Sequence, residues 1–427
     1  MRILLPATTI VRMRILFIHQ NIPGQFRHLI GALCADAGNS VWAIGGAKAA
    51  ARAGALFPRL NLVSYTAPAA AAGGHPWLVD VDAQLRRGQV VAKAMQQVKD
   101  KGIGFDVIVA HPGWGEAMFV KDVFPATPLL TYFEFFYTAT GADVGFDPEF
   151  PTGPESAQRL RVRNMPHLSA LNACDAGMTP TRWQHSRLPR EYQPRVAVVH
   201  EGVDTDAIRP DPAARFEWQG RVFEAGQPLV TYVARNLEPY RGIHVFLRAL
   251  PALLATEPSA QVLVVGGDEV SYGMACPHPD GWRAALVDEL ARAGTPLDPA
   301  RVHFLGRLAF GEYLKVLQVS AAHVYLTYPF VLSWSMLEAM AAGCFVIGSN
   351  TAPVSEVIVD GANGRLVDFF DRDALVCAVV HALRDPTRGR ASREAARATV
   401  VQRYDLKRRC LPAALKLIGA LANVPRP

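Results

Sequence analysis

The chain has 427 residues, half of them apolar and 19% charged, which allows large buried cores and excludes a disordered chain or a disulfide scaffold. Lys and Arg number 44 against 38 Asp and Glu, so the net charge of +6 is too small and too dispersed to indicate nucleic-acid binding. No apolar run reaches the ~18 residues of a membrane span. Six scattered cysteines without a Cys-x-x-Cys pair are typical of a reduced, cytoplasmic protein.

The first residues differ in character from those that follow. The tetrapeptide that begins at Met1, Met-Arg-Ile-Leu, recurs at Met13. The apolar stretch between them is short, contains Pro6 and lacks the small-residue cleavage site of a secretory signal. We therefore expect residues 1–12 to be an extension, and the folded chain to begin near Met13.

Short apolar runs alternate with amphipathic segments through the first half of the chain. This alternation predicts a parallel sheet with helices on both faces, because each strand must then be buried on both sides. The predicted strands are residues 15–19, 40–44, 60–65, 107–110 and 129–132, and the predicted helices are residues 26–34, 84–98 and 157–171.

The second half repeats this pattern after residues 204–227, whose Asp, Pro and Gly content is typical of a linker. We therefore predict an α/β protein of two doubly wound, Rossmann-like domains that face a cleft, with ligands at the carboxyl ends of the strands. The predicted domains are residues 13–205 and 206–395, followed by a C-terminal helix within residues 396–427. The predicted strands are 229–233, 262–265, 302–305, 324–326, 345–348 and 364–367, and the predicted helices are 243–254, 281–292, 311–320, 335–342 and 373–383.

Two candidate ligand contacts follow strands in the first half. Gly24 lies in the loop after the first strand, where a missing side chain lets the backbone approach a ligand; an ordinary turn is the alternative. The loop lacks the Gly-x-Gly-x-x-Gly pattern, which disfavours a nicotinamide cofactor. His111 comes just after a buried strand, on the ligand side of such a sheet, although a lone histidine often has only a structural role.

Arg235 and Arg241 share one loop after the first strand of the second half. Two guanidinium groups can hold a diphosphate through charge-assisted, forked hydrogen bonds. Solvated surface arginines are the alternative.

A helix is predicted to begin near Ser333, Trp334 and Ser335, and its free N–H groups and dipole favour a phosphate. Glu338 falls in the first turn. Its carboxylate would repel a phosphate, so we expect it to accept hydrogen bonds from sugar hydroxyls. The alternative is that Ser335 and Glu338 form a capping box, which needs no ligand.

From Met13 onward, the chain resembles the GT-B glycosyltransferases of family 4, the retaining nucleotide-sugar transferases. The resemblance implies that the C-terminal helix crosses back to the first domain. The segments that carry the resemblance are the Gly24 loop, the His111 segment, Thr179-Pro-Thr, Glu201-Gly-Val-Asp, the Arg235 to Gly242 loop, Val264-Val-Gly-Gly-Asp, Phe304-Leu-Gly-Arg-Leu and Leu337-Glu-Ala-Met-Ala-Ala-Gly.

The resemblance also implies a role for each candidate residue. Arg235 and Arg241 would hold the leaving diphosphate, Glu338 would bind ribose hydroxyls, and His111 would contact the donor sugar. The remaining donor-binding residues would be Gly24 at the diphosphate, Arg307 and Leu308 beside the base, and Ser333, Trp334 and Ser335 at the helix start.

The chain departs from the family pattern at several places, among them Val331 and Ser333, which stand where the motif has glycines. The family motif has two glutamates eight positions apart; Glu338 matches the second, but Phe330 stands at the first, which changes the expected contact with the donor sugar. Arg241 replaces the family's lysine, which keeps the charge but not the geometry.

The implied function is retaining transfer of a hexose-type sugar from a nucleotide-sugar donor to a saccharide or lipid-linked acceptor, in bacterial polysaccharide or glycolipid synthesis. We predict no cofactor and no metal, because arginines and a helix dipole can supply the positive charge. No nucleic-acid partner is expected, and peripheral contact with the inner face of the membrane is left open. The alternatives are a nucleotide-sugar 2-epimerase, a non-catalytic sugar-nucleotide-binding subunit and a nicotinamide-dependent dehydrogenase.

Overall fold

The computed structural model describes residues 12–69 and 73–423, except for the side chains of residues 386–388. The predicted N-terminal extension therefore lies outside the described residues apart from Arg12. Within the described part of the chain, no helix is both long and apolar enough to cross a membrane.

The chain divides into two compact units. The first unit contains residues 1–140, 150–202 and 407–427, and the second contains residues 141–149 and 203–406. Residues 141–149 thus belong to the second unit, whereas the sequence placed them with the first domain.

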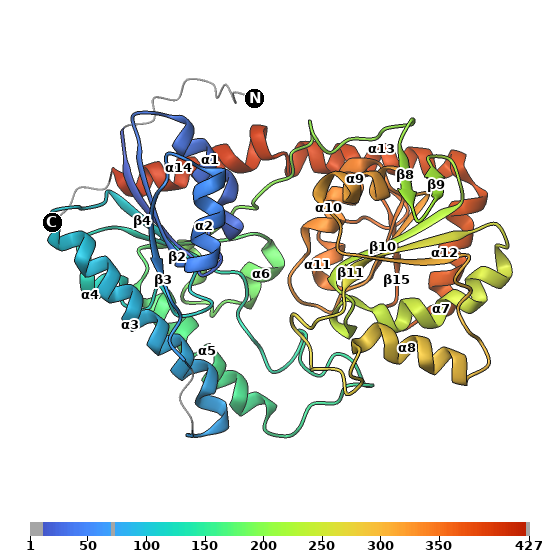
Figure 1. The fold of residues 1–427 in the computed structure, drawn as a ribbon, viewed down its shortest axis with the longest axis horizontal. Coiled ribbons are helices and arrows are strands. Elements are labelled where there is room, and N and C mark those ends of the chain that lie inside the picture. Colours follow the sequence, from blue (N-terminus) through green and yellow to red (C-terminus); the bar gives the residue numbers. More distant parts are fainter. Residues whose placement is uncertain (1–11, 70–72, 424–427) are drawn as a thin grey trace. The chain divides into compact units, whose positions relative to one another are not determined.

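The first unit is built on a parallel seven-stranded sheet of order β3-β2-β1-β4-β5-β6-β7. Figure 1 shows α1 and α2 beside one face of this sheet, and α3 and α4 beside the other. The strands are β1 (Arg14–Ile18), β2 (Ser40–Gly46), β3 (Asn61–Tyr65), β4 (Val107–Ala110), β5 (Leu129–Tyr132), β6 (Ala176–Thr179) and β7 (Val196–Val198), and the α-helices are α1 (Arg27–Ala35), α2 (Ala47–Leu56), α3 (Val79–Asp100), α4 (Val120–Val123), α5 (Ser156–Ala173), α6 (Arg182–Arg187) and α14 (Leu411–Ala422).

The central strands of the first unit are short, apolar and fully covered. All four residues of β4 are buried, as expected for a strand with helices on both faces. β1 pairs with β2 on one side and with β4 on the other, so the order of the strands reverses between β1 and β4. Such a switch point is where open α/β sheets bind ligands.

The second unit is built on a parallel six-stranded sheet of order β12-β11-β10-β13-β14-β15, whose switch point lies between β10 and β13. In Figure 1, α9 and α10 lie on one face of this sheet, and α7 and α8 on the other. The strands are β10 (Leu229–Asn236), β11 (Gln261–Gly267), β12 (Val302–Gly306), β13 (Ala322–Tyr325), β14 (Val346–Ser349) and β15 (Arg365–Val367), and the α-helices are α7 (Ile243–Thr256), α8 (Gly281–Arg292), α9 (Phe310–Gln318), α10 (Trp334–Ala342), α11 (Ala352–Ser355), α12 (Arg372–Arg384) and α13 (Pro386–Arg403).

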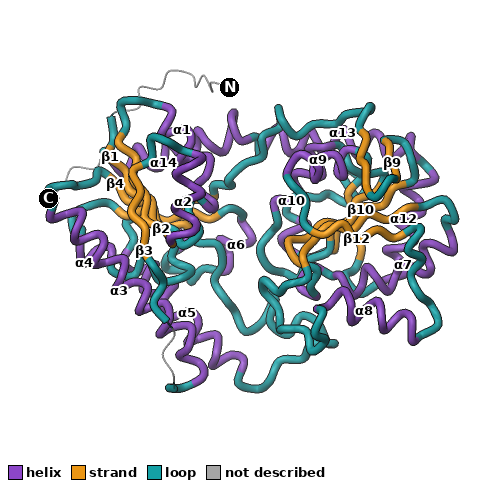
Figure 2. The backbone as a smooth tube through the Cα atoms, in the orientation of Figure 1, coloured by secondary structure: helices purple, strands orange, loops and turns teal. Residues whose placement is uncertain are grey.

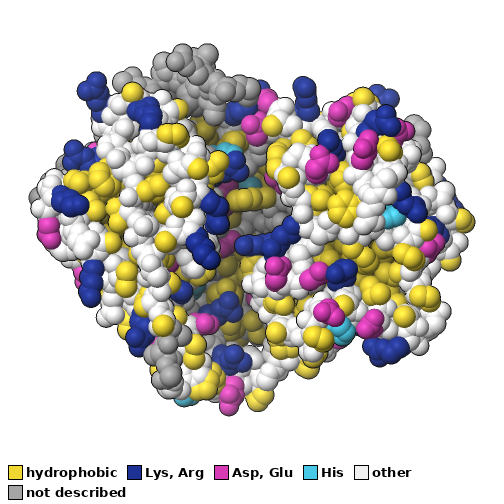
Figure 3. Space-filling model, in the orientation of Figure 1, with side chains coloured by type: hydrophobic (Ala, Val, Ile, Leu, Met, Phe, Trp, Pro, Cys, Tyr) yellow, Lys and Arg dark blue, Asp and Glu magenta, His cyan; other side chains and the backbone are white. Residues whose placement is uncertain are grey.

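The two sheets confirm the predicted α/β plan of two doubly wound, Rossmann-like domains. Figure 2 shows the strands of each unit gathered in one layer among helices. In the second unit, Lys and Arg side chains are interspersed with Asp and Glu over the face drawn in Figure 3, in keeping with the small net charge.

The predicted linker is partly wrong, because residues 204–227 contain the antiparallel hairpin β8 (Arg215–Trp218) and β9 (Arg221–Glu224). Phe216 and Phe223 face each other across it and are buried in the core of the second unit. The two-residue turn uses Gln219 and Gly220 with positive φ angles of 49° and 76°, which match the twist of a tight hairpin.

The predicted C-terminal helix is also interrupted. α13 ends at Arg403 and packs on α10 of the second unit, and a π-helical turn, Leu406–Cys410, then leads into α14. α14 contacts α1 and β4 of the first unit.

Candidate functional site

Two histidines lie at the switch point of the first sheet. His19 directly follows β1 and His111 directly follows β4, and their ring centroids are 5.0 Å apart. The His111 backbone N–H donates to the Ile18 carbonyl oxygen at 3.0 Å, so the two strand ends are joined where the histidines leave the sheet.

The His111 ring is buried and enclosed by aromatic side chains. It stacks on Trp114 at 4.6 Å and on Tyr132 at 5.5 Å between centroids. Its Nδ1 accepts a hydrogen bond from the Gly113 backbone N–H at 3.0 Å. The neutral ring therefore carries its hydrogen on Nε2, which lies 3.6 Å from Glu134 Oε2.

Gly24 lies beside His19. Its φ is +47°, and a side-chain Cβ there would come within 2.5 Å of His19 Nε2. Packing against His19 therefore already requires a glycine, with or without a ligand. His19 Nδ1 accepts from the Asn21 N–H at 2.9 Å, so its Nε2 donates to Gln25 Oε1 at 2.7 Å. Burial, together with nearby His111, lowers the pKa of His19 to about 3 and keeps the ring neutral.

Sequence reasoning did not single out Glu134, Gln25, Trp114 or His19 as site residues. Glu134 comes two residues after β5, and Gln25 Nε2 donates to Glu134 Oε1 at 3.4 Å. Burial raises the pKa of Glu134, but interactions with His111, His19 and Gln25 outweigh it and leave the pKa below its ordinary value. Listing every polar residue that ends a predicted central strand or closely follows one would have found His19 and Glu134.

At the switch point of the second sheet, Arg241 is buried. It ends a short 3-10 helix, Pro239–Arg241, after β10, and its Nη1 donates to Thr327 Oγ1 at 2.8 Å and to the Val331 carbonyl oxygen at 3.0 Å. The next residue, Gly242, has a φ of +73°, and a Cβ there would meet Leu326 at 2.4 Å. The positive φ of this glycine thus lets the chain turn into α7 at the residue that follows Arg241.

Arg235 lies in a different environment from Arg241. It is exposed near the end of β10, and no hydrogen bond or ion pair joins its side chain to other described residues. The predicted pair therefore consists of one solvent-facing guanidinium and one interior guanidinium at the same end of one strand.

The start of α10 is already partly satisfied by protein atoms. Ser333 is the N-cap, and its backbone N–H donates to the Tyr325 hydroxyl at 2.8 Å. The Ser335 N–H donates to Ser333 Oγ at 3.4 Å, and Ser335 is buried, whereas Trp334 is 46% exposed. Ser335 is therefore not the N-cap, and the alternative of a Ser335–Glu338 capping box is wrong.

Glu338 is half-buried on α10. Tyr313 of α9 donates its hydroxyl to Glu338 Oε2 at 2.6 Å. Burial raises the pKa of the Glu338 carboxyl, and the Tyr313 hydrogen bond only partly offsets this. The predicted place of Glu338 in the first turn is wrong, because α10 begins at Trp334 and Glu338 follows its first turn.

Phe330, which replaces the family's first glutamate, lies in an aromatic cluster. Its ring is edge-on to Tyr240 at 5.6 Å and to Tyr272 at 5.1 Å between centroids. Tyr240 also packs on Tyr328 at 4.7 Å. The place of a charged side chain is therefore filled by buried aromatic carbon.

Arg307 lies over an open groove at the ends of β11 and β12. Its Nη2 donates to Asn236 Oδ1 at 2.8 Å and forms an ion pair with Glu269. Arg283 and Asp268, which also line the groove, form a two-point ion pair at 2.8 and 2.9 Å. Leu308 instead packs against the apolar core.

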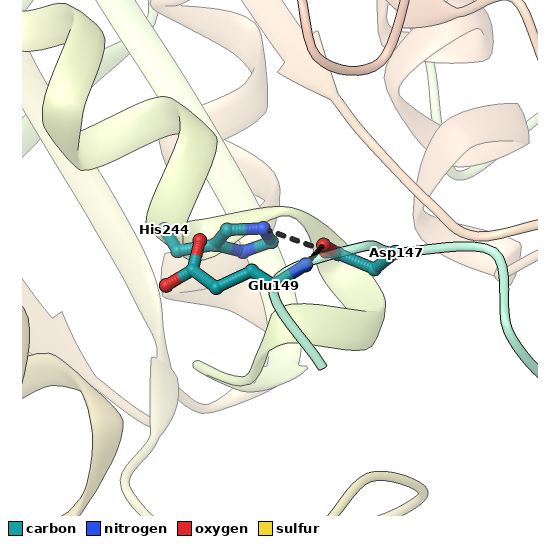
Figure 4. Close-up of side chains that lie close together, drawn as sticks. All are labelled: Asp147, Glu149 and His244. Carbon is teal, nitrogen blue, oxygen red and sulfur yellow. Dashed lines mark hydrogen bonds and ion pairs between the residues drawn. The ribbon is translucent and has the colours of Figure 1, made fainter. Parts of the chain in front are cut away.

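Residues 141–149 are attached to the second unit by buried polar contacts. Asp147 Oδ2 accepts from His244 Nε2 at 2.9 Å and from the Tyr328 hydroxyl at 2.6 Å. Figure 4 shows Asp147 and Glu149 on this segment with His244 at the start of α7. Arg248 holds the Glu149 carboxylate through two hydrogen bonds, at 2.6 and 2.8 Å.

Asp147, Glu149 and His244 are also the one group, within the described part of the chain, close enough to share a metal ion, with ligand atoms within 4.8 Å of one another. Each carboxylate already accepts hydrogen bonds, and the Arg248 cation lies beside the group. These hydrogen bonds and ion pairs hold residues 141–149 to the second unit, and we assign no metal to the group.

The comparisons with known proteins match both halves of the chain to glycosyltransferase domains. Residues 37–208 match the model of the Glycosyl transferase family 4 group, and residues 227–385 match that of Glycosyl transferases group 1. The structure of Anabaena Alr3699/HepE in complex with UDP is similar over 95% of this chain and 99% of that chain, with a TM-score of 0.66 and 18% identity. The chain has the GT-B fold. Sucrose-phosphate synthase from Thermosynechococcus elongatus shares the fold as well, with a TM-score of 0.68 at 19% identity over 96% of this chain and 98% of that one.

Two curated relatives are mannosyltransferases of Mycolicibacterium smegmatis. The GDP-mannose-dependent alpha-(1-6)-phosphatidylinositol monomannoside mannosyltransferase is 29% identical over 52% of this GT-B chain and 56% of its own length. The phosphatidyl-myo-inositol mannosyltransferase is 30% identical over 52% of this chain and 51% of its own length. The chain thus spans about half the length of these relatives.

Proposed function

We propose that this GT-B chain transfers a hexose-type sugar from a nucleotide-sugar donor to a saccharide or lipid-linked acceptor, with retention of the anomeric configuration. The observation that carries the proposal is the environment of Arg241. Its guanidinium is buried, and no carboxylate among the described residues forms an ion pair with it.

Burial disfavours the Arg241 charge, but nearby groups, among them the buried Glu238 carboxylate, outweigh burial and leave the pKa of Arg241 above its ordinary value. The guanidinium therefore stays charged, and a bound diphosphate would give it a direct anionic partner. Arg235 at the same strand end offers a second guanidinium, and the α10 dipole directs its positive end toward the loop after β13. These three features support a diphosphate site at the β10/β13 switch point.

The chemistry follows from this charge. Glycosyl transfer breaks the bond between the anomeric carbon and the diphosphate oxygen, so negative charge builds up on the departing diphosphate. Fixed positive groups stabilise that charge more in the transition state than in the ground state. For retention, the leaving phosphate takes the proton of the acceptor hydroxyl on the face from which it departs, and no protein nucleophile is required.

The proposal extends to the setting of the reaction. The two mannosyltransferase relatives act, by their names, on phosphatidylinositol lipids. An acceptor of that kind would bring the chain to the cytoplasmic face of a membrane as a peripheral protein. Sedimentation with vesicles that contain phosphatidylinositol, compared with phosphatidylcholine vesicles, tests this part separately.

The central experiment is a thermal-shift panel of UDP-, GDP-, ADP- and dTDP-sugars, followed by product analysis with the stabilising donor. We expect one nucleotide to raise Tm and the matching sugar to be transferred to an added acceptor extract. An epimer formed from the donor alone would instead indicate a 2-epimerase. Binding without turnover in any extract would indicate a non-catalytic subunit, and no stabilisation by any nucleotide would contradict the proposal.

A further inference from the structure

A carboxylate, an imidazole N–H and an indole ring meet at the β1/β4 switch point of the first unit. Glu134 Oε2 lies 3.6 Å from His111 Nε2, and the His111 ring stacks on Trp114 at 4.6 Å between centroids. The Glu134 side chain is 35% exposed, and Trp114 is half-buried. Solvent therefore reaches Glu134 and Trp114, whereas His111 is buried behind them.

His111 Nε2 is buried and has no hydrogen-bond partner among the residues that the structure describes. A buried donor without an acceptor is rare in native proteins, because its lost hydration is not replaced. The 3.6 Å separation from Glu134 is too long for a hydrogen bond. One hydroxyl oxygen placed ~2.8 Å from both atoms would close the gap, because it can accept from the imidazole N–H and donate to the carboxylate.

Glu134 is held ready to accept such hydrogen bonds. Gln25 Nε2 donates to its Oε1 at 3.4 Å, and Gln25 is oriented in turn by neutral His19. Burial raises the Glu134 pKa, but interactions with His111, together with the Gln25 hydrogen bond, outweigh it and keep the pKa below its ordinary value, so the carboxylate is ionised at neutral pH and acts only as an acceptor.

This set of groups suits a sugar better than other ligand classes. An ionised carboxylate repels phosphates and forms no hydrogen bond with an apolar ligand, whereas hydroxyl groups donate to it readily. The C–H bonds of a pyranose can pack on the face of an indole, whose π-system is negative. The N–H of the neighbouring imidazole orients a hydroxyl that is shared with the carboxylate.

We propose that Glu134 is a substrate-binding residue that, with His111 and Trp114, binds neighbouring hydroxyl groups of a pyranose or cyclitol ring in the first unit. The inference rests on the proposed function, because a glycosyltransferase handles such rings as both donor sugar and acceptor. Either ring presents the same chemistry to Glu134, so the experiment must tell the two sources apart.

The loop that carries His111 and Trp114 is well anchored for this role. Arg87 Nε donates to the Trp114 carbonyl oxygen at 2.7 Å, and the Tyr65 hydroxyl donates to buried Glu116. A Cβ at Gly115 would come within 2.2 Å of the Gln84 carbonyl oxygen, so α3 packs directly on the loop. Binding therefore requires little ordering of the protein.

The test compares full-length wild type with Glu134→Gln, which keeps the shape of the side chain, and with Glu191→Gln, a matched control at an exposed glutamate of the first unit. Saturation-transfer NMR measures binding of methyl α-D-mannopyranoside, methyl α-D-glucopyranoside and myo-inositol. Calorimetry measures binding of GDP, UDP, GDP-mannose and UDP-glucose. If Glu134→Gln does not fold, Trp114→Phe replaces it, since the Trp114 contact to Arg87 uses only the backbone.

We expect at least about tenfold weaker binding of one ring source in Glu134→Gln, the loss expected for a hydrogen bond to a charged group. Weaker binding of a nucleotide-sugar with unchanged binding of the free nucleotide identifies the donor sugar. Weaker binding of a glycoside or inositol alone identifies the acceptor. Affinities equal to those of Glu191→Gln, or wild type that binds no ring compound, would overturn the inference. If wild type binds neither the nucleotides nor the nucleotide-sugars, the result would instead count against the proposed function.

Discussion

Arg235 and Arg241 lie six positions apart in the sequence, yet they should respond to substitution in different ways. Arg235 is exposed, and its side chain forms no hydrogen bond or ion pair with other described residues. Arg241 is buried, donates to Thr327 and to the Val331 carbonyl oxygen, and has a raised pKa, so the fold stabilises its charge. Comparing the two separates a binding role from a structural one.

We expect Arg235→Ala to lower kcat/KM by at least about tenfold, because one hydrogen bond to a charged group contributes about 1.5–3 kcal/mol. The Tm should not change. Arg241→Met should abolish binding of the nucleotide diphosphate and also lower Tm, because the hydrogen bonds to Thr327 and to the Val331 carbonyl oxygen are lost. Steady-state kinetics, calorimetry and thermal unfolding measure these effects, with exposed Arg372→Ala as the control. Unchanged kinetics in both variants would rule out the diphosphate site.

Glu338 gives a prediction with a defined pH dependence. Burial raises its pKa in the folded state, so the native state binds this proton more tightly than the unfolded chain does. Protonation therefore adds stability that is fully present below the unfolded pKa, about 4.3, and is lost as pH rises through the folded pKa.

Glu338→Gln mimics the protonated form. We expect its Tm to match wild type near pH 4 and to equal or exceed it at pH 8, while nucleotide binding weakens. Thermal unfolding across this pH range and calorimetry with the stabilising nucleotide provide the readout. A Tm well below wild type at pH 8, together with normal affinity, would assign Glu338 a structural role through Tyr313.

At the scale of elements, the segment of residues 141–149 is the clearest feature that the sequence did not predict. It has no helix or strand, and its contacts come from single side chains whose partners lie about a hundred residues away or more, such as His244 and Tyr328. No periodic pattern can report such a contact. The β8–β9 hairpin was missed for another reason: its strands are four residues each, and polar residues surround the two buried phenylalanines.

Asp147→Asn tests whether this segment depends on its buried carboxylate. Burial raises the Asp147 pKa, but hydrogen bonds from His244 and Tyr328 outweigh it and leave the pKa low. The stabilisation is therefore present above the unfolded pKa, about 3.9, and is lost as pH falls through the folded pKa. We expect a lower Tm and faster amide exchange over residues 141–149 at pH 7, at about 1.5–3 kcal/mol for each charged hydrogen bond lost.

The difference from wild type should shrink as pH falls through the folded pKa, because Asp147 then becomes protonated in the native state as well. If exchange in residues 141–149 stays as slow in Asp147→Asn as in wild type at pH 7, the carboxylate does not hold the segment. The remaining contacts, such as the Arg248–Glu149 pair, would then suffice.

At the scale of the whole molecule, the structural elements that recur in both halves were predicted from the sequence, and those that occur once were missed. Apolar strands between amphipathic helices occur in both halves, and their spacing alone predicted both sheets and most of their strands. Candidate residues were found where a strand end carries an unusual side chain, as at His111 and Arg241. The surroundings of these residues were not predicted, because the burial of Arg241 and the pairing of His111 with Glu134 depend on which strands become neighbours.

The last prediction concerns the charge that the whole chain provides for the leaving group. If Arg235, Arg241 and the α10 dipole provide it, a divalent cation is not needed, and we expect EDTA to leave kcat/KM within about twofold of its value in buffer without chelator. Arg241→Met should in turn not be rescued by Mg²⁺ or Mn²⁺. The measurement is the release of nucleotide diphosphate from the stabilising donor, with metal content checked before and after chelation.

Loss of activity in EDTA that Mn²⁺ restores would mean that a metal ion also binds the diphosphate. Asp147→Asn would then be the first variant to examine, because Asp147 belongs to the one described group able to hold an ion. Normal metal dependence in that variant would direct the search to the carboxylates of the groove beside Arg307.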